Sequence, residues 1–341
     1  PAAIAWLRSP AKRVSTTVTV PVACAPGAGA PSGACRASTR TTTPVGVRST
    51  FTHVTDGLAT TAAGAFADAA GTATRRNAAT SSRVAMRVTP LPPTTRVGAV
   101  GLSVADLERS IAYYGSAIGL DLLAREDGVA RMGAGGETLV ELVEEPGAVP
   151  APTTSGLFHL ALLVPTRRDL ANWLQHAIDA RVPIDGIADH VVSEAIYLTD
   201  PDGHGIEVYA DRDRASWEGR VAELMGTFAL DVPDLLAEAD GGELPPETTM
   251  GHVHLRVRDI PETIAFHRDV VGWDLMMGFG PQAAFLSAGG YHHHIGANTW
   301  QSAGQRAGQP GEARLLYATI VSPDGGEDFE DPSGIRFRFA S

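Results

Sequence analysis

The chain has 341 residues, a formal net charge of −12 at pH 7 and two cysteines. A chain of this length can form two domains with cores of ordinary size. The excess of acidic residues argues against a nucleic-acid-binding protein, and no apolar run approaches the ~20 residues of a membrane span. Both cysteines, Cys24 and Cys35, lie near the N-terminus. The rest of the chain therefore has no disulfide or thiolate metal site, which is typical of cytoplasmic proteins.

Residues 1–95 differ in composition from the rest of the chain. They contain ten Lys and Arg against two acidic residues, whereas the remaining residues contain 17 against 37, so the net charges are +8 and −20. They are rich in Ala, Thr, Ser and Gly and show no sustained helical or strand period. This composition predicts a disordered, low-complexity tail. The alternatives are a natural start at Met86 and, from the Arg-rich and acid-poor sequence, an organelle transit peptide.

From residue 96 onward the sequence repeats a pattern of one strand, one helix and several short strands. The first unit opens with a strand at 97–104, after which Asp106 caps a helix that ends at Gly119. Short strands follow through residue 145. The second unit opens with a strand at 158–164 and has its helix at 169–180. We assign these two units to residues 96–212.

The C-terminal part of the chain contains two further units after a linker. Residues 213–249 are rich in Pro, Glu and Gly and predict a linker with one helix, near 216–225. The third unit has its helix at 261–271, with Pro261 in the first turn, and its strands are expected to continue through 291–296. The fourth unit opens at 315–321 and has no room for a helix of normal length. Units three and truncated four together occupy residues 250–341.

Residues 190–207 carry the most informative motif of the chain. They read as a strand, a tight turn at Asp200-Pro201-Asp202-Gly203 and a second strand. Glu207 falls inside the second, largely apolar strand. An unpaired buried carboxylate is costly, so Glu207 requires a partner, and a metal ion is one such partner.

Strand, helix and three strands, repeated four times, resemble the vicinal oxygen chelate superfamily. Residues 190–207 resemble the signature of its extradiol ring-cleaving dioxygenases, with His190, Tyr197, the Asp-Pro-x-Gly turn and Glu207 in order. Ala188 is a minor departure from that signature. The tandem layout is most similar to the bacterial catechol-2,3-dioxygenase subgroup. The resemblance implies an α+β fold of four βαβββ modules that form two vicinal-oxygen-chelate cups, with metal ligands on the first and last strands of a module.

An alignment of the four units indicates which ligand positions are filled. The first strands offer Ala99, His159, His252 and Leu316, and the last strands offer Glu141, Glu207, His294 and Arg336. His159, His252 and Glu207 supply the two His and one carboxylate of an open-faced non-haem iron site. This set requires unit two to pair with unit three and unit one with unit four. Pairing in sequence order would leave no cup with a complete set.

The resemblance also implies residues around the metal. His190 and Tyr197 would orient the substrate, and a His on the last strands of unit three would act as acid–base catalyst. We expect this to be His294, because it aligns with the ligand position of the last strands. Alternation along a strand places His292 on the same face, so His292 is the alternative, and His293 on the other face. Three further residues are expected to bind the substrate. They are His254, two positions after the ligand His252, His292 of the triple His, and Trp300, an aromatic residue of the pocket wall.

The predicted function is extradiol cleavage of catechol or a substituted catechol, with insertion of both atoms of O2 at Fe(II) in preference to Mn(II). Such an enzyme would serve aromatic hydrocarbon catabolism in the cytoplasm. Its partners would be a small aromatic diol and O2, and a sheet edge exposed by the truncated unit four would favour a homo-oligomer. The alternatives are a glyoxalase-like metal-dependent isomerase or lyase, which usually has two carboxylates in its site, and a metal-free binding protein of the same fold.

Overall fold

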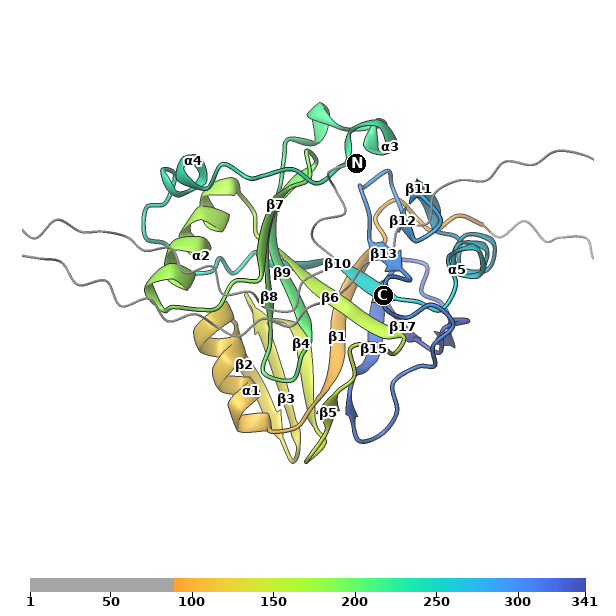
Figure 1. The fold of residues 1–341 in the computed structure, drawn as a ribbon, viewed down its shortest axis with the longest axis horizontal. Coiled ribbons are helices and arrows are strands. Elements are labelled where there is room, and N and C mark those ends of the chain that lie inside the picture. Colours follow the sequence, from red (N-terminus) through yellow and green to blue (C-terminus); the bar gives the residue numbers. More distant parts are fainter. Residues whose placement is uncertain (1–88) are drawn as a thin grey trace, which may run out of the picture. The chain divides into compact units, whose positions relative to one another are not determined.

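The computed structural model of the protein describes residues 89–341 (Figure 1). The predictions of a disordered tail and of a start at Met86 therefore fall outside the described residues, apart from residues 89–95. Within the described part no helix has the length and apolar character needed to cross a membrane.

The first and fourth units build one sheet. Its helical segment is α1 (Leu107–Tyr113), which continues as a π-helical turn at Tyr114–Ile118. Its strands are β1 (Arg96–Val104), β2 (Asp121–Glu126), β3 (Val129–Ala134), β4 (Glu137–Glu144), β15 (Leu315–Val321), β16 (Phe329–Glu330) and β17 (Arg336–Ala340). The fourth unit has no helix between β15 and β17, as its short sequence predicts.

The second and third units build the other sheet. Its helices are α2 (Arg167–Asp179) and α5 (Ile260–Phe266), and α5 continues as a π-helical turn at His267–Val271. Its strands are β6 (Gly156–Leu163), β7 (Gly186–Asp189), β8 (Ser193–Thr199), β9 (Gly205–Asp211), β10 (Thr249–Arg256), β11 (Asp274–Phe279), β12 (Ala283–Ser287) and β13 (Ile295–Asn298). Two short strands, β5 (Val149–Pro150) and β14 (Glu312–Ala313), pair separately.

The sheet topology confirms the predicted crossed pairing of the units. The seven-stranded sheet has the order β16-β17-β15-β1-β4-β3-β2, and the eight-stranded sheet has the order β11-β12-β13-β10-β6-β9-β8-β7. Unit one therefore shares a sheet with unit four, and unit two shares a sheet with unit three. The α+β fold of four modules in two cups is confirmed, with the fourth module lacking its helix.

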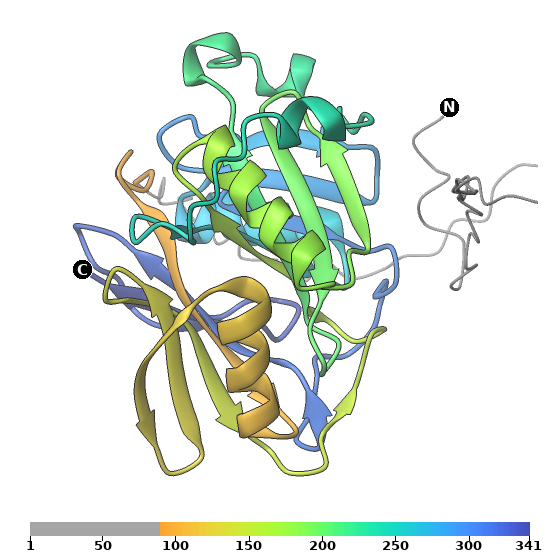
Figure 2. The same cartoon turned by 90° about the vertical axis from the view of Figure 1, so that its left-hand side faces the viewer.

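The helices begin and end where local sequence chemistry dictates. Asp106 and Asp259 each accept a hydrogen bond from a backbone N–H in the first turn, and Thr166 forms a capping box with Asp169. Gly119 and Gly272 end the two π-helical turns with φ of 95° and 100°, in the left-handed region that favours glycine. In Figure 2, α1 and α2 each lie across the face of the sheet of their own unit.

The linker between units two and three contains more helical segments than expected. The sequence predicts one helix near 216–225, whereas the structure has a 3₁₀ turn at Arg214–Ser216, α3 (Val221–Leu224) and α4 (Val232–Leu236). Gly219, with φ of 70°, separates the first two of these segments.

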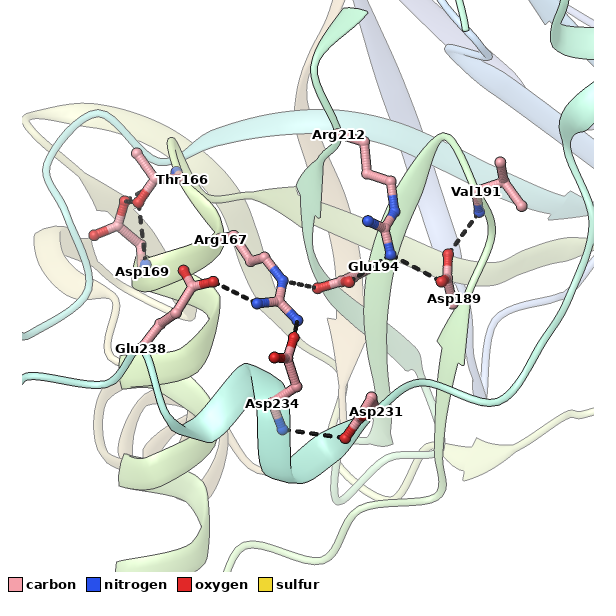
Figure 3. A network of polar contacts seen from close by, with 10 residues as sticks. All are labelled: Thr166, Arg167, Asp169, Asp189, Val191, Glu194, Arg212, Asp231, Asp234 and Glu238. Atoms are coloured by element: carbon pink, nitrogen blue, oxygen red, sulfur yellow. Dashed lines mark hydrogen bonds and ion pairs between the residues drawn. The ribbon is translucent and has the colours of Figure 1, made fainter. Parts of the chain in front are cut away.

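A buried carboxylate anchors the signature strand β8 to the elements around it (Figure 3). Glu194 is 2% exposed and accepts hydrogen bonds from Arg167 Nε at 2.7 Å and Arg212 Nη2 at 2.6 Å. Arg167 also pairs with Asp234 and Glu238 near α4, and Arg212 also pairs with Asp189. Because both partners of Glu194 are themselves anchored, the network ties α2, α4, β7 and β8 to the residue that directly follows β9 (Figure 3).

The triple-His stretch lies in a turn, so the prediction of a strand through 291–296 was wrong. Strand β12 ends at Ser287 and β13 begins only at Ile295. Gly289 and Gly290, with φ of 62° and 69°, turn the chain between β12 and β13. Strand alternation therefore does not apply to residues 292–294.

Candidate metal centre

Three adjacent strands bring His159, Glu207 and His252 together. Strand β6 lies between β9 and β10, and it carries His159 and, two positions later on the same face, Ala161. Ala161 is paired with Glu207 on one side and with His252 on the other. The small side chain of Ala161 therefore leaves a space that the imidazoles and the carboxylate surround.

The geometry of these three residues fits one metal ion. One ligand atom from each lies within 4.8 Å of the others, and all three side chains are buried. Glu207 Oε2 is 2.9 Å from His159 Nε2 and 3.2 Å from His252 Nε2. Neighbouring ligand atoms of an octahedral ion with bonds of about 2.1 Å lie about 3 Å apart. The structure thus places the carboxylate and both imidazoles at the spacing of adjacent coordination positions.

The hydrogen-bonding state of His159 supports the same interpretation. Its Nε2 atom is fully buried and makes no hydrogen bond, although Glu207 Oε2 is near, because the two groups are not aligned for one. A buried nitrogen without a hydrogen-bond partner is uncommon and calls for an explanation. A metal ion between the two groups would satisfy both of them.

The protonation states suit metal binding at neutral pH. Burial favours the neutral form of Glu207, but His252 and His159 outweigh it and hold the pKa of the Glu207 carboxyl well below its usual range. Burial lowers the pKa of His252 to about 4, although Glu207 opposes this shift. At pH 7 the site therefore offers an anionic carboxylate and a neutral imidazole, which are the forms that bind metals.

Tyr197 lies beside His159, and His190 contacts Tyr197. The Tyr197 ring centroid is 5.5 Å from that of His159, and Tyr197 Oη is 2.7 Å from His190 Nε2. His190 Nδ1 is 2.7 Å from the carbonyl oxygen of Gly226. A carbonyl only accepts, so Nδ1 carries the hydrogen of a neutral His190, and Tyr197 donates its hydroxyl hydrogen to Nε2. Burial and then Glu207 raise the pKa of Tyr197 well above its usual value, so it remains a phenol.

The residue next to His190 has an unusual backbone conformation. Val191 has φ of 70°, which a β-branched residue rarely adopts. Its N–H donates to Asp189 Oδ1 at 2.8 Å, and Arg212 holds the other oxygen of Asp189 (Figure 3). Backbone strain of this kind concentrates at functional sites, where surrounding contacts maintain it.

Aromatic side chains surround His254, which lies on β10 two positions after His252. The ring centroid of His254 is 5.0 Å from that of His159, 5.2 Å from Phe158 and 5.8 Å from Trp300. Its Nε2 atom is buried without a hydrogen-bond partner. The structure therefore places His254 and Trp300 near His159, and it adds Phe158, a bulged residue of β6 that the sequence did not single out.

Within the triple-His turn, His293 and not His294 lies against the centre. The ring centroid of His293 is 4.1 Å from that of His252. His294 Nδ1 is instead 2.9 Å from Ser287 Oγ, and its ring packs on Trp273. The expectation that His294 faces the site and His293 faces away is thus corrected, because it assumed an alternating strand where the structure has a turn.

His292 is also placed differently from the prediction. Its Nε2 atom is 2.8 Å from Asp211 Oδ1, and its Nδ1 atom is 2.8 Å from His293 Nδ1. Both ring nitrogens are therefore occupied by protein groups, and His292 has no free nitrogen for a substrate. Its contacts make it a support for His293.

Two His and one carboxylate on a metal leave adjacent coordination positions free. Such a site can bind two substrate oxygens and a further small molecule at the same time, whereas a structural site with four protein ligands could not. The phenol and imidazoles around it offer hydrogen-bond donors and acceptors to those oxygens.

Known proteins resemble this chain in sequence and in structure. Residues 96–208 match the Glyoxalase/Bleomycin resistance protein/Dioxygenase superfamily. The chain is 42% identical over 248 residues to the catechol-2,3-dioxygenase of Bacillus subtilis (strain 168), which covers 69% of this chain and 86% of that relative. A solved structure of a protein from Bacillus subtilis subsp. subtilis str. 168, provisionally named a dioxygenase, matches with a TM-score of 0.51 and 14% identity, over 74% of this chain and 86% of that chain.

The solved structure supports the fold, and the sequence match is long enough to decide the family. With 42% identity across most of the relative's length, the chain belongs to the Glyoxalase/Bleomycin resistance protein/Dioxygenase superfamily.

Proposed function

We propose that the protein is an extradiol dioxygenase that cleaves the ring of catechol or a substituted catechol with O2 at an Fe(II) centre. The observation that carries this proposal is the convergence of His159, Glu207 and His252 beside the Tyr197–His190 pair. The name of the 42% identical relative supports the same reaction. A glyoxalase-like isomerase would not explain the Tyr197–His190 pair, and its usual second carboxylate is not among the three clustered ligands.

His159, His252 and Glu207 would hold the metal. When bound, Fe(II) supplies adjacent positions for the two oxygens of the diol and for O2, and it allows electrons to pass between them. The protein contributes a buried set of ligands that lie on the three adjacent strands β9, β6 and β10.

Tyr197 and His190 would orient the diol. The Tyr197 phenol donates its one hydrogen to His190 Nε2, so its oxygen is left to accept a hydrogen bond from a hydroxyl of the diol. His190 is fixed by the Gly226 carbonyl, so its Nε2 can take the hydrogen of Tyr197 or a proton from the substrate.

His293 would receive a proton from the bound diol. Its Nδ1 atom faces His292 Nδ1, which leaves Nε2 as the nitrogen available to the substrate. With Asp211 accepting from Nε2–H of a neutral His292, His292 Nδ1 accepts from His293 Nδ1–H. His293 Nε2 then carries the lone pair that a general base requires, on a ring whose centroid is 4.1 Å from that of His252.

The test compares Glu207 with Glu141, the carboxylate at the same position of the other cup. The full chain would be loaded with Fe(II) without oxygen, mixed with catechol and then exposed to air. We expect a yellow ring-cleavage product with one O2 consumed per product. Glu207→Ala should abolish product formation, and Glu141→Ala should retain it.

The other outcomes would overturn the proposal in different ways. Stoichiometric metal binding without product would favour the isomerase or lyase reaction. No metal binding by the wild-type chain would favour a metal-free binding protein. Equal loss in both Glu variants would mean that a folding defect, and not the metal centre, governs the activity.

A further inference from the structure

Arg256 lies on the same strand and the same face as the metal centre. It is the last residue of β10, two positions beyond His254 and four beyond His252. Alternate residues of a strand share a face, and four positions span about 13 Å between Cα atoms. An arginine side chain from Arg256 can therefore reach a substituent of a molecule held at the centre.

Arg256 lines a cavity next to the aromatic wall of the site. The cavity has a volume of about 330 Å³ and lies where the start of β6, the turn between β8 and β9 and the end of β10 meet. This volume is in the range of sites for small ligands. Phe158 lines the cavity and also packs against His159 and His254. Phe158 is therefore shared by the cavity and the surroundings of His159.

The charge of Arg256 has no carboxylate partner among residues 89–341. Its Nε donates to the carbonyl of Thr154 at 3.0 Å, and its Nη2 to that of Ala151 at 3.4 Å. A guanidinium has five N–H donors, so three remain for another group. Burial lowers the pKa of Arg256 to about 10, and the side chain is therefore still a cation at neutral pH.

The other charged side chains of the cavity are already paired. Asp202 accepts from Arg109 Nη2 at 2.7 Å, and Arg314 pairs with Glu145. Other half-buried arginines, Arg167 and Arg212, also have carboxylate partners. A largely buried cation without such a partner is unfavourable unless an anion arrives with the ligand. Arg256 therefore supplies a net positive charge to an otherwise balanced cavity.

We propose that Arg256 and this cavity bind a carboxylate carried by the aromatic diol, so that the preferred substrate is a catechol with an acidic side chain. The inference rests on the proposed ring cleavage and specifies its substrate class. The carboxylate would form charge-assisted hydrogen bonds with the free donors of Arg256. A carboxylate created at the cleaved ring would remain beside the triad, whereas Arg256 lies further along β10.

The first experiment compares an acid with its neutral methyl ester in the Fe(II)-loaded full chain. The substrates are 3-(3,4-dihydroxyphenyl)propanoate and its ester, which differ in charge at the side chain and share the diol. We expect kcat/KM to favour the acid by about tenfold or more, the range of a hydrogen bond to a charged group. Arg256→Gln should reduce this ratio by about tenfold, and Arg256→Lys should retain part of it.

A matched control removes a different arginine. Arg338→Gln makes the same change of charge in the other cup, where Arg338 stacks on Tyr317, and should leave the ratio of acid to ester unchanged. Thermal unfolding of each variant would be recorded, because Arg256 also holds the carbonyls of Ala151 and Thr154.

The second experiment measures binding without chemistry. Isothermal titration of the chain without added metal with 3-phenylpropanoate, which lacks the diol, should give a Kd that Arg256→Gln raises about tenfold and Arg338→Gln does not. Equal affinities in all three proteins would overturn the inference, as would cleavage of the ester and acid at equal kcat/KM. Arg256-dependent binding of the acid with no cleavage of either substrate would overturn the proposed ring cleavage and leave an anion site.

Discussion

The two cups of this protein have the same strand arrangement but different chemistry at equivalent positions. In one cup β1 is parallel to β4 and antiparallel to β15, and in the other β6 is parallel to β9 and antiparallel to β10. Gly101 is paired with Glu141 and Tyr317, as Ala161 is paired with Glu207 and His252. Each cup therefore has a carboxylate beside a small residue on its central strand.

The two cups differ in the groups that surround this carboxylate. Glu207 faces two imidazoles at metal-ligand spacing. Glu141 instead accepts from the Tyr317 hydroxyl at 3.0 Å and lies 3.3 Å from Arg131 Nε, and Arg338 stacks 3.6 Å above the Tyr317 ring. A carboxylate inside a sheet needs a cation or donors. One cup supplies donors and a cation from its own side chains, and the other brings two imidazoles to a spacing that suits a metal ion.

The largest effect is expected when a residue of the cup that holds the His-Glu-His cluster is replaced by its counterpart from the other cup. His252→Tyr replaces a ligand by the residue that occupies its position beside Gly101, and we expect it to abolish ring cleavage. Loss of a residue that only supports a metal ligand lowers metal affinity by up to about 100-fold. Loss of the ligand His252 should lower it further. Metal content after dialysis and O2 uptake would measure both effects.

Tyr317→Phe is the control for that change. It removes the hydrogen bond to Glu141 in the other cup and should leave metal content and activity as in the wild type. Retention of tight metal binding in His252→Tyr would contradict the assignment of His252 as a ligand.

The triple-His turn gives a matched pair of variants within the metal cup. His293→Gln removes the imidazole beside His252, and we expect kcat to fall by about 100-fold, the lower range for loss of an acid–base group. His294→Gln removes an imidazole that bonds Ser287 and packs on Trp273, so it should lower stability with little change in kcat. Steady-state kinetics and thermal unfolding separate the two effects, and the reverse pattern would restore His294 as the acid–base residue.

The part of the site that follows from strand periodicity could be predicted from the sequence. His159, Glu207 and His252 lie within strands, although bulges adjoin His159 and His252. Their positions in a repeated unit already indicated the crossed pairing that the sheets confirm. The sequence failed where the backbone departs from regularity. Gly289 and Gly290 turn the chain before the triple His, and a register shift next to Gly101 places Tyr317, not Leu316, opposite the central strand.

Arg256 was not found from the sequence because its distinguishing feature is the lack of a carboxylate partner among the described residues. A lone arginine at the end of a strand is ordinary in a sequence. Only the structure shows that no carboxylate among residues 89–341 pairs with it while comparable arginines are paired.

The smallest expected effect is the stabilisation of the fold by metal. This stabilisation should depend on Glu207 and not on Glu141, so it also distinguishes the two cups. A ligand that binds only the folded state at ten times its Kd stabilises the fold by about 1.4 kcal/mol. We expect Fe(II), added without oxygen to the metal-free chain, to raise the unfolding temperature of the wild type and of Glu141→Gln alike. Glu207→Gln should show no such rise, because its neutral amide replaces the anionic ligand that joins β9 to the two His strands. Stabilisation of Glu207→Gln by the same amount would mean that the metal stabilises the chain at a site outside this triad, and the contrast between the cups would then have to be explained without it.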